Sequence, residues 1–482
     1  MTTATNPAQK QRASASGYIH WSNPHCSGPH WSSARPWQTN AALVLIGTAL
    51  FFLSRQLTSE YTHFTIGFSG VSGWSAILYL AAAFLILTQP VDRFTFPIIL
   101  AVAIACRLAV LFAEPFLSSD VYRYVWDGVV QHAHISPYQY VPGNPVLAFL
   151  REPNQDIFDN INRRDYAHTI YPPGAQALFY LITWISPTVT FMKTAMVLFE
   201  GVTMYALIKL LRHLGIRREQ TLLYAWCPIL IWEIAGSGHL DSVAMAFITL
   251  ALLARYRKQS VLTGLFLAIA VLLKFYPLVL FPALYRRGDF KMPATLAAVI
   301  AVAYAAYSGV GTLVFGFIGG YVKEEGVANG SRYFLLELAQ RIPGLHNLST
   351  TAYFIFCAAI FVAIMWWCRE VANEQGSEEA FLRPAFSIAA ALMFLFSPHY
   401  AWYIIWLVPF FTLMPNLPIL TYLLGFFYLY TTALAEPGPK MFLANEILYA
   451  AVFAAFLFQI ILNRWPIHRI LFVQHTTPSG RL

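Results

Sequence analysis

The sequence passes from apolar to polar at residues 98–128, which read IILAVAIACRLAVLFAEPFLSSDVYRYVWDG. The first part of this stretch is apolar enough to cross a bilayer, and the last part carries Asp120, Arg123 and Asp127. Similar apolar runs recur along all 482 residues, of which 58% are hydrophobic and only 11% are charged. A soluble protein of this composition would expose far too much apolar surface. The sequence therefore predicts an all-α polytopic membrane protein.

Apolar segments long enough to be membrane spans are spread over the whole chain, and we expect about 12–14 transmembrane helices. The candidates are residues 40–58, 73–90, 95–113, 190–212, 219–236, 241–256, 260–274, 276–285, 292–318, 351–368, 382–397, 400–414, 417–434 and 444–463. Loops rich in Lys and Arg stay in the cytoplasm, and this rule orients the chain. Such loops lie at 209–218, 255–258, 286–291 and 464–469.

Residues 1–38 are rich in Ser, Trp, His and Pro and predict a disordered cytoplasmic leader, followed by a single transmembrane domain over 39–482. Three spans then place residue 114 outside the membrane. The basic loop at 209–218 is expected to be cytoplasmic, so only one of the segments 171–186 and 190–212 can cross the membrane. We assign the crossing to the longer segment and expect 171–186 to be an interfacial helix. The alternative is that one of the first three spans is not real, which reverses the amino terminus.

This topology predicts a large extracytoplasmic first loop, residues 114–189, which contains interfacial helices. It also places five polar clusters on the outer side of the membrane. They are SSDVYRYVWDG (118–128), IYPPG (170–174), SGHLDS (237–242), KFYP (274–277) and SPHYAWY (397–403). The cluster KFYP lies outside only if residues 260–285 form a short helical hairpin broken at Pro277. A single kinked span would reverse the membrane orientation of every later span.

The net charge of +8 does not indicate nucleic acid, because the basic residues occur in short clusters between apolar runs rather than in one stripe. The five cysteines lack CxxC spacing, so neither a disulfide framework nor a zinc site is indicated. No cofactor and no resident metal is expected. Asp120 and Asp127 could nevertheless both reach a divalent cation, and metal dependence is left open.

A helix that begins after Ser119 would place Asp120, Arg123, Tyr124 and Asp127 on one face and apolar residues on the other. Such an interfacial helix holds a carboxylate at the level of the lipid headgroups. The simpler interpretation is that Asp120 complements the helix dipole and that Asp127 pairs with Arg123 at i,i+4. The stretch alone supports both interpretations equally.

The other clusters favour the functional interpretation. His239 and Asp241 begin a predicted helix, and Lys274 ends another, where an ammonium group suits the phosphate of a membrane lipid. Taken singly, Lys274 is explained by snorkelling, and His239 and His399 by interfacial hydrogen bonds. Taken together, the clusters predict an acid–base site beside an anion site.

Several charged residues lie within predicted spans and should face the protein interior, because a charge in lipid is costly. Arg107 and Glu114 could pair at the end of the third span, whereas Glu200 and Glu233 lie in the fourth and fifth. None of these four is predicted to be catalytic.

The order of the polar motifs resembles a known family. The motifs are RLAVLFAEPFLSSDVYRYVWDGVVQHAHISPYQYVP (107–142), YPPGAQALFY (171–180), GHLDSVAMAF (238–247), LLKFYPLVLFPAL (272–284) and FSPHYAWYIIWLVPFF (396–411). Over residues 105–415 the chain resembles polyprenyl-phosphate-sugar-dependent glycosyltransferases of the GT-C fold, similar to bacterial mannosyltransferases of glycosyltransferase family 87. Many relatives have SPWY where this chain has SPHY, so His399 departs from the family pattern.

The resemblance implies a GT-C-like bundle in the bacterial cytoplasmic (inner) membrane, with the active site facing outside. It implies inverting transfer of a sugar, with mannose favoured, from a polyprenyl-phosphate donor to a glycolipid, polysaccharide or protein acceptor. Asp120 would be the catalytic base. The residues expected to bind substrate are Lys274, His239, Asp241, Arg123, Asp127, Tyr124, Tyr171 and His399, with Lys274 the first choice for the leaving phosphate.

Two other classes of protein fit the composition. A polytopic secondary transporter or lipid-linked glycan flippase would use these charges along a path through the membrane, but no paired Gly/Pro-broken helices occur in corresponding halves. A lipid-bound structural or assembly protein would leave the Asp120 segment without a purpose.

Overall fold

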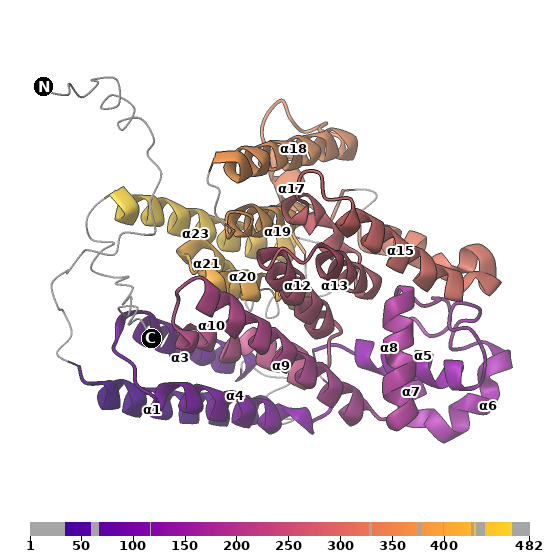
Figure 1. The fold of residues 1–482 in the computed structure, drawn as a ribbon. Helices are drawn as coiled ribbons and strands as arrows, with labels where there is room; N and C mark the ends of the chain where they lie inside the picture. Colours follow the sequence, from indigo (N-terminus) through magenta and orange to yellow (C-terminus); the bar gives the residue numbers. More distant parts are fainter. Residues whose placement is uncertain are drawn as a thin grey trace, which may run out of the picture.

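The computed structural model describes residues 34–58, 67–115, 117–326, 330–374, 378–398, 400–425, 429 and 439–464. Within these ranges every regular element is helical, and the helices pack into one bundle (Figure 1). In the described part of the chain, five helices are long and apolar enough to cross a membrane. They are α1 (Pro36–Leu57), α3 (Gly67–Thr88), α9 (Val189–His213), α18 (Thr350–Glu374) and α23 (Pro439–Arg464). The predicted all-α polytopic membrane class is confirmed.

Five further predicted spans appear as shorter apolar helices. These are α4 (Thr95–Leu111), α12 (Asp241–Tyr256), α13 (Ser260–Leu273), α15 (Lys291–Ala306) and α19 (Leu382–Phe396). Helix α12 packs between α9 and α13, and α13 also contacts α15. Residues of these helices belong to one buried apolar cluster that extends from α1 to α23. The core is therefore shared by helices from the whole of the described chain.

The prediction of a single span over 219–236 is wrong. The chain there forms η4 (Arg218–Thr221), α10 (Leu222–Ala225), α11 (Pro228–Leu230) and the π-helical turn η5 (Ile231–Gly236). Pro228 lacks a backbone N–H and begins a new helix, which explains the break. Other proline-containing segments are also short: η6 (Tyr276–Leu280), α14 (Phe281–Leu284), α20 (Leu407–Leu413) and α21 (Leu417–Gly425). A further short segment is η8 (Ala401–Tyr403).

The span predicted over 292–318 also ends early, because the chain bends by 110° after α15. It continues as η7 (Ser308–Phe315) and α16 (Ile318–Glu324), followed by α17 (Phe334–Gln340). The bent pair counts as a sixth candidate span if it is taken as one unit. These interruptions explain why fewer unbroken membrane-length helices are found than the 12–14 expected from hydropathy.

The predicted first loop contains helices, as expected: α5 (Asp120–His132), η2 (Pro145–Leu147), α6 (Ala148–Arg151), η3 (Glu152–Asn154), α7 (Gln155–Asp159) and α8 (Pro173–Ile185). Figure 1 shows α5, α6, α7 and α8 together at one end of the bundle. Helix α8 packs on α5 and α13. Its 13 residues extend about 20 Å, which is less than a bilayer core of about 30 Å. This length agrees with the interfacial helix predicted at 171–186.

The predicted leader can be followed only at its end. Residues 1–33 lie outside the described residues, and α1 begins at Pro36, so the first transmembrane helix includes the last residues assigned to the leader.

A buried ion pair joins α4 to α9. Arg107 Nη2 lies 2.7 Å from Glu200 Oε1 and Arg107 Nε lies 2.8 Å from Glu200 Oε2, so the pair is bidentate. Arg107 Nη1 also donates to the Ala225 carbonyl at 2.7 Å. The expected Arg107–Glu114 pair is wrong, because Glu114 is exposed beyond the end of α4 while Arg107 points into the bundle. Glu200 and Glu233 are buried, as predicted.

Replacement of Arg107 by methionine is expected to destabilise the fold by about 3 kcal/mol, because it leaves the Glu200 carboxylate buried without its partner. The double variant Arg107→Met/Glu200→Met should lose clearly less, since no unpaired charge remains. Reversible unfolding in detergent micelles measures both. Equal losses in the single and double variants would contradict an ion-pair origin.

Candidate functional site

Asp120 is the first residue of α5 and lies half-buried at the end of the bundle that contains α5–α8 (Figure 1). Ser119 occupies the N-cap position but makes no side-chain capping bond; the Ser118 hydroxyl accepts from the Asp120 N–H at 3.2 Å instead. Asn162 Nδ2 donates to Asp120 Oδ1 at 3.3 Å and to Ser119 Oγ at 3.1 Å. The loop before α8 therefore orients the carboxylate of Asp120.

Lys274 follows directly after α13 and pairs with Asp241, the first residue of α12. Its Nζ lies 3.1 Å from Asp241 Oδ2, and the two side chains are 15% and 0% exposed. The Tyr276 hydroxyl donates to Asp241 Oδ1 at 3.2 Å. Asp120 also interacts electrostatically with the Lys274 ammonium group. The structure thus brings Asp120 and Lys274 together from segments far apart in the sequence.

Two tyrosine rings flank this ammonium group. Lys274 Nζ lies 6.0 Å from the centre of the Tyr171 ring and 5.9 Å from that of Tyr403, at the edge of cation–π range. Burial, with the nearby Asp120 carboxylate, raises the pKa of the Tyr171 phenol well above its usual value. Tyr171 therefore stays protonated and keeps a hydrogen-bond donor beside Asp120 and Lys274.

The segment after the 110° bend adds residues that the sequence analysis did not select. The Tyr321 hydroxyl contacts the Tyr403 hydroxyl, and the Arg332 guanidinium lies 5.5 Å from the Tyr403 ring. Arg332 pairs with Glu325, and Arg163 Nε pairs with Glu324 Oε2 at 2.7 Å. Tyr403 thus lies between two cations, Lys274 and Arg332. The dense charges of YVKEE at 321–325 were the available sequence signal.

A glycine lets this segment approach the loop before α8. Gly316 has φ of 55°, a left-handed conformation that favours glycine. A Cβ atom added there would lie only 1.7 Å from the Thr169 carbonyl oxygen, and the next residue, Phe317, donates its N–H to that oxygen at 3.2 Å. This contact between Phe317 and Thr169 holds α16 beside the site.

His239 lies in the wall of the site, behind Trp402. It is fully buried, its Nε2 lies 3.2 Å from Glu233 Oε2, and its ring stacks on Trp402 at 4.4 Å. Glu233 belongs to the π-helical turn η5, a type of irregularity often found at functional sites. His239 is thus positioned two residues before Asp241 and in contact with an aromatic residue adjacent to Tyr403.

Two charged residues on the polar face of α5 are buried, although an interfacial helix would expose them to the lipid headgroups. Arg123 and Asp127 are 7% and 1% exposed, because α8 and the loop before it cover them. Arg123 Nε pairs with Asp127 Oδ1 at 2.7 Å, which confirms the i,i+4 pair. Gln176 Nε2 donates to Asp127 Oδ2 at 2.8 Å, and Arg123 Nη1 donates to the Ala167 carbonyl at 3.1 Å. These contacts favour a structural role, and substrate binding by the pair stays a prediction.

Tyr124 is also buried: its ring stacks on Phe179 at 4.7 Å and meets the edge of Tyr171 at 5.0 Å. Tyr124 thus packs against Tyr171 and supports its position. A direct contact between Tyr124 and substrate stays a prediction. His399, the last predicted binding residue, lies outside the described residues. Among the residues that are described, no group of three or more His, Cys, Asp or Glu side chains is arranged to hold a metal ion.

Comparison with known families adds an independent finding. Residues 39–286 match the family model described as alpha-(1->6)-mannopyranosyltransferase, N-terminal domain, of the MptA_B family. The match covers about half of the chain and contains Asp120, Asp241 and Lys274. No curated protein and no solved structure matches the chain.

Proposed function

The chain belongs to the alpha-(1->6)-mannopyranosyltransferase family, and we propose that it transfers mannose from a polyprenyl-phosphate donor to a lipid-linked or polysaccharide acceptor. The family and the membrane-length helices together make it a membrane mannosyltransferase. The proposal adds the donor class, the acceptor class and the location of the site on the outer face of the bacterial cytoplasmic membrane. It also adds the roles of Asp120 and Lys274.

The observation that carries this proposal is the placement of a half-buried carboxylate and a largely buried ammonium group in one site. Sugar transfer from a phosphate donor needs both groups: a base for the acceptor hydroxyl and a cation for the departing phosphate. Asp120 and Lys274 supply this pair. The tyrosine rings beside Lys274 offer surfaces on which a sugar can pack.

In the proposed step, the acceptor oxygen forms a bond to the anomeric carbon of mannose while the bond from that carbon to the phosphate oxygen breaks. Asp120 takes the hydroxyl proton, and the electron pair of the broken bond stays on the polyprenyl phosphate. Lys274 stabilises the negative charge that develops there. A single displacement of this kind inverts the anomeric centre.

Asp241 has a different role from Asp120 in this scheme. Its carboxylate is fully buried and contacts both Lys274 and Tyr276, so it is suited to fixing the ammonium group rather than to accepting a proton. A direct contact of Asp241 with substrate, as predicted from the sequence, would require one of these partners to move.

The test is a transfer assay with the purified protein in nanodiscs, a synthetic polyprenyl-phosphate mannose and a mannoside acceptor. We expect a new glycosidic product without any nucleotide sugar, and NMR of the product should show inversion at the anomeric carbon. Product formed from a nucleotide sugar alone would overturn the donor assignment. Movement of a solute or lipid-linked glycan across liposomes, with no glycosidic product, would support the transporter or flippase instead.

A further inference from the structure

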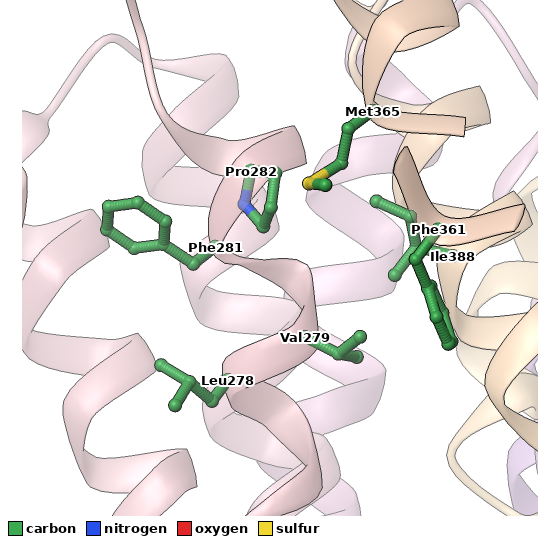
Figure 2. Close-up of a pocket in the computed structure, with 7 residues that line it drawn as sticks. All are labelled: Leu278, Val279, Phe281, Pro282, Phe361, Met365 and Ile388. Carbon is green, nitrogen blue, oxygen red and sulfur yellow. The ribbon is translucent and has the colours of Figure 1, made fainter. Parts of the chain in front are cut away.

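An apolar groove of about 260 Å³ lies between the segment that follows Lys274 and two later helices (Figure 2). One wall is formed by η6 and α14, from Leu278 to Pro282. The other is formed by Phe361 and Met365 of α18 and by Ile388 of α19. Every lining residue has an apolar side chain, and Figure 2 shows Met365 and Val279 pointing into the space between the two walls.

The groove is open on the outside of the bundle, because Leu278 and Met365 in its walls are 48% and 36% exposed. Helix α18 is one of the membrane-length helices, and only 11% of its most apolar window is buried inside the protein. Most of its surface must therefore contact lipid chains. A hydrocarbon chain can reach the groove from the membrane without crossing water.

In the sequence, the residues of one groove wall follow closely after Lys274, the proposed phosphate ligand. Val279 follows Lys274 by five residues through the 3₁₀ segment η6, which at about 2 Å per residue corresponds to about 10 Å. One short segment thus carries a cation at its start and an apolar wall at its end. An amphiphile with an anionic head and a long hydrocarbon tail matches both ends.

We propose that this groove binds the isoprenoid chain of the donor lipid whose phosphate lies at Lys274. The inference rests on the proposed function, because that function places the donor phosphate at Lys274. A sugar or peptide is a poor occupant, since the lining offers it no hydrogen bonds. The groove is small, about 260 Å³, so it holds a section of the chain and leaves the rest in the bilayer.

A substitution that fills the groove tests this proposal. Met365→Trp adds bulk from the exposed side of α18, and Val362→Trp is the matched control, because Val362 is 56% exposed on the same helix and does not line the groove. For a long-chain donor, Met365→Trp should raise KM about tenfold with kcat unchanged. For a dimethylallyl-phosphate mannose, whose single five-carbon unit is too short to reach the groove, both variants should match the wild type.

An unchanged KM for the long-chain donor in Met365→Trp would overturn the proposal. An equal rise in KM for the short-chain donor would do so as well, because it would indicate damage at the headgroup site. Thermal unfolding of both variants confirms that the fold is intact.

Photolabelling provides a readout that does not depend on turnover. Polyprenyl phosphate with diazirines along its chain should label peptides containing Met365 or Val279, and unlabelled polyprenyl phosphate should compete. Equal competition by phosphatidylglycerol would identify a structural lipid site and overturn the proposal. Labelling elsewhere, by a donor that the protein does use, would reject the groove and leave the proposed function standing. Absence of transfer from any polyprenyl donor would reject the function and the groove assignment together.

Discussion

Asp120→Asn is expected to lower kcat by about 10²–10⁴-fold, the usual contribution of a positioned general base. The asparagine amide has nearly the same shape and can still accept a hydrogen bond from Asn162, so the local structure should be retained. It cannot take a proton from the acceptor hydroxyl. The KM for the donor should therefore change little, since Lys274 and the tyrosine rings are untouched.

The matched controls are other aspartates of the same loop. Asp156 is exposed on α7, so Asp156→Asn should leave both stability and turnover unchanged. Asp127 is buried with Arg123 and Gln176, so the main effect of Asp127→Asn should be a loss of stability rather than of turnover. Turnover of Asp120→Asn near the wild-type value would exclude Asp120 as the base. So would an unchanged pH–rate profile, because a base whose protonation limits the rate gives the wild type an acidic limb that the variant should lose.

Local sequence signals were sufficient to place the start of α5, the end of α13 and the beginning of α12. Each position combines a change from apolar to polar residues with a helix boundary, and such information is contained in short windows of sequence. The side of the membrane assigned to these boundaries then predicted the proximity of Asp120 to Lys274. In the structure, the Asp120 carboxylate and the Lys274 ammonium group interact electrostatically, which is consistent with this prediction.

The remaining site residues depend on tertiary structure. Tyr321, Glu325 and Arg332 reach the site only because the chain bends after α15 and because Gly316 lets it approach Thr169. Hydropathy continues smoothly through that bend and gives no sign of it. The burial of Arg123 and Asp127 likewise depends on α8 covering α5, which a helical wheel of one segment cannot show.

The partners of the intramembrane charges could not be predicted either, because they also depend on tertiary structure. Arg107 pairs with a residue 93 positions later, whereas sequence reasoning favoured the nearby Glu114. A buried charge predicts that a partner exists, but it does not say which of several candidates the packing of helices will present.

Lys274→Met is expected to raise the donor Kd by about 10–100-fold, because it removes a charge-assisted contact with the phosphate worth about 1.5–3 kcal/mol. The same substitution leaves the carboxylate of Asp241 buried with only Tyr276 as a partner, so stability should fall as well. These two effects must be separated before the loss is assigned to the phosphate. Equilibrium binding of a fluorescent polyprenyl phosphate and unfolding in detergent give the two measurements.

The double variant Lys274→Met/Asp241→Asn makes the separation. Neutralising Asp241 should restore most of the stability, because no unpaired charge remains, but it should not restore donor affinity, because the ammonium group is still missing. Asp241→Asn alone keeps Lys274 and should bind polyprenyl phosphate at least as tightly as the wild type. If the double variant instead regains wild-type affinity, Lys274 serves only to neutralise Asp241, and the phosphate must be held by another cation. Arg332, whose guanidinium lies 5.5 Å from the Tyr403 ring, is one candidate.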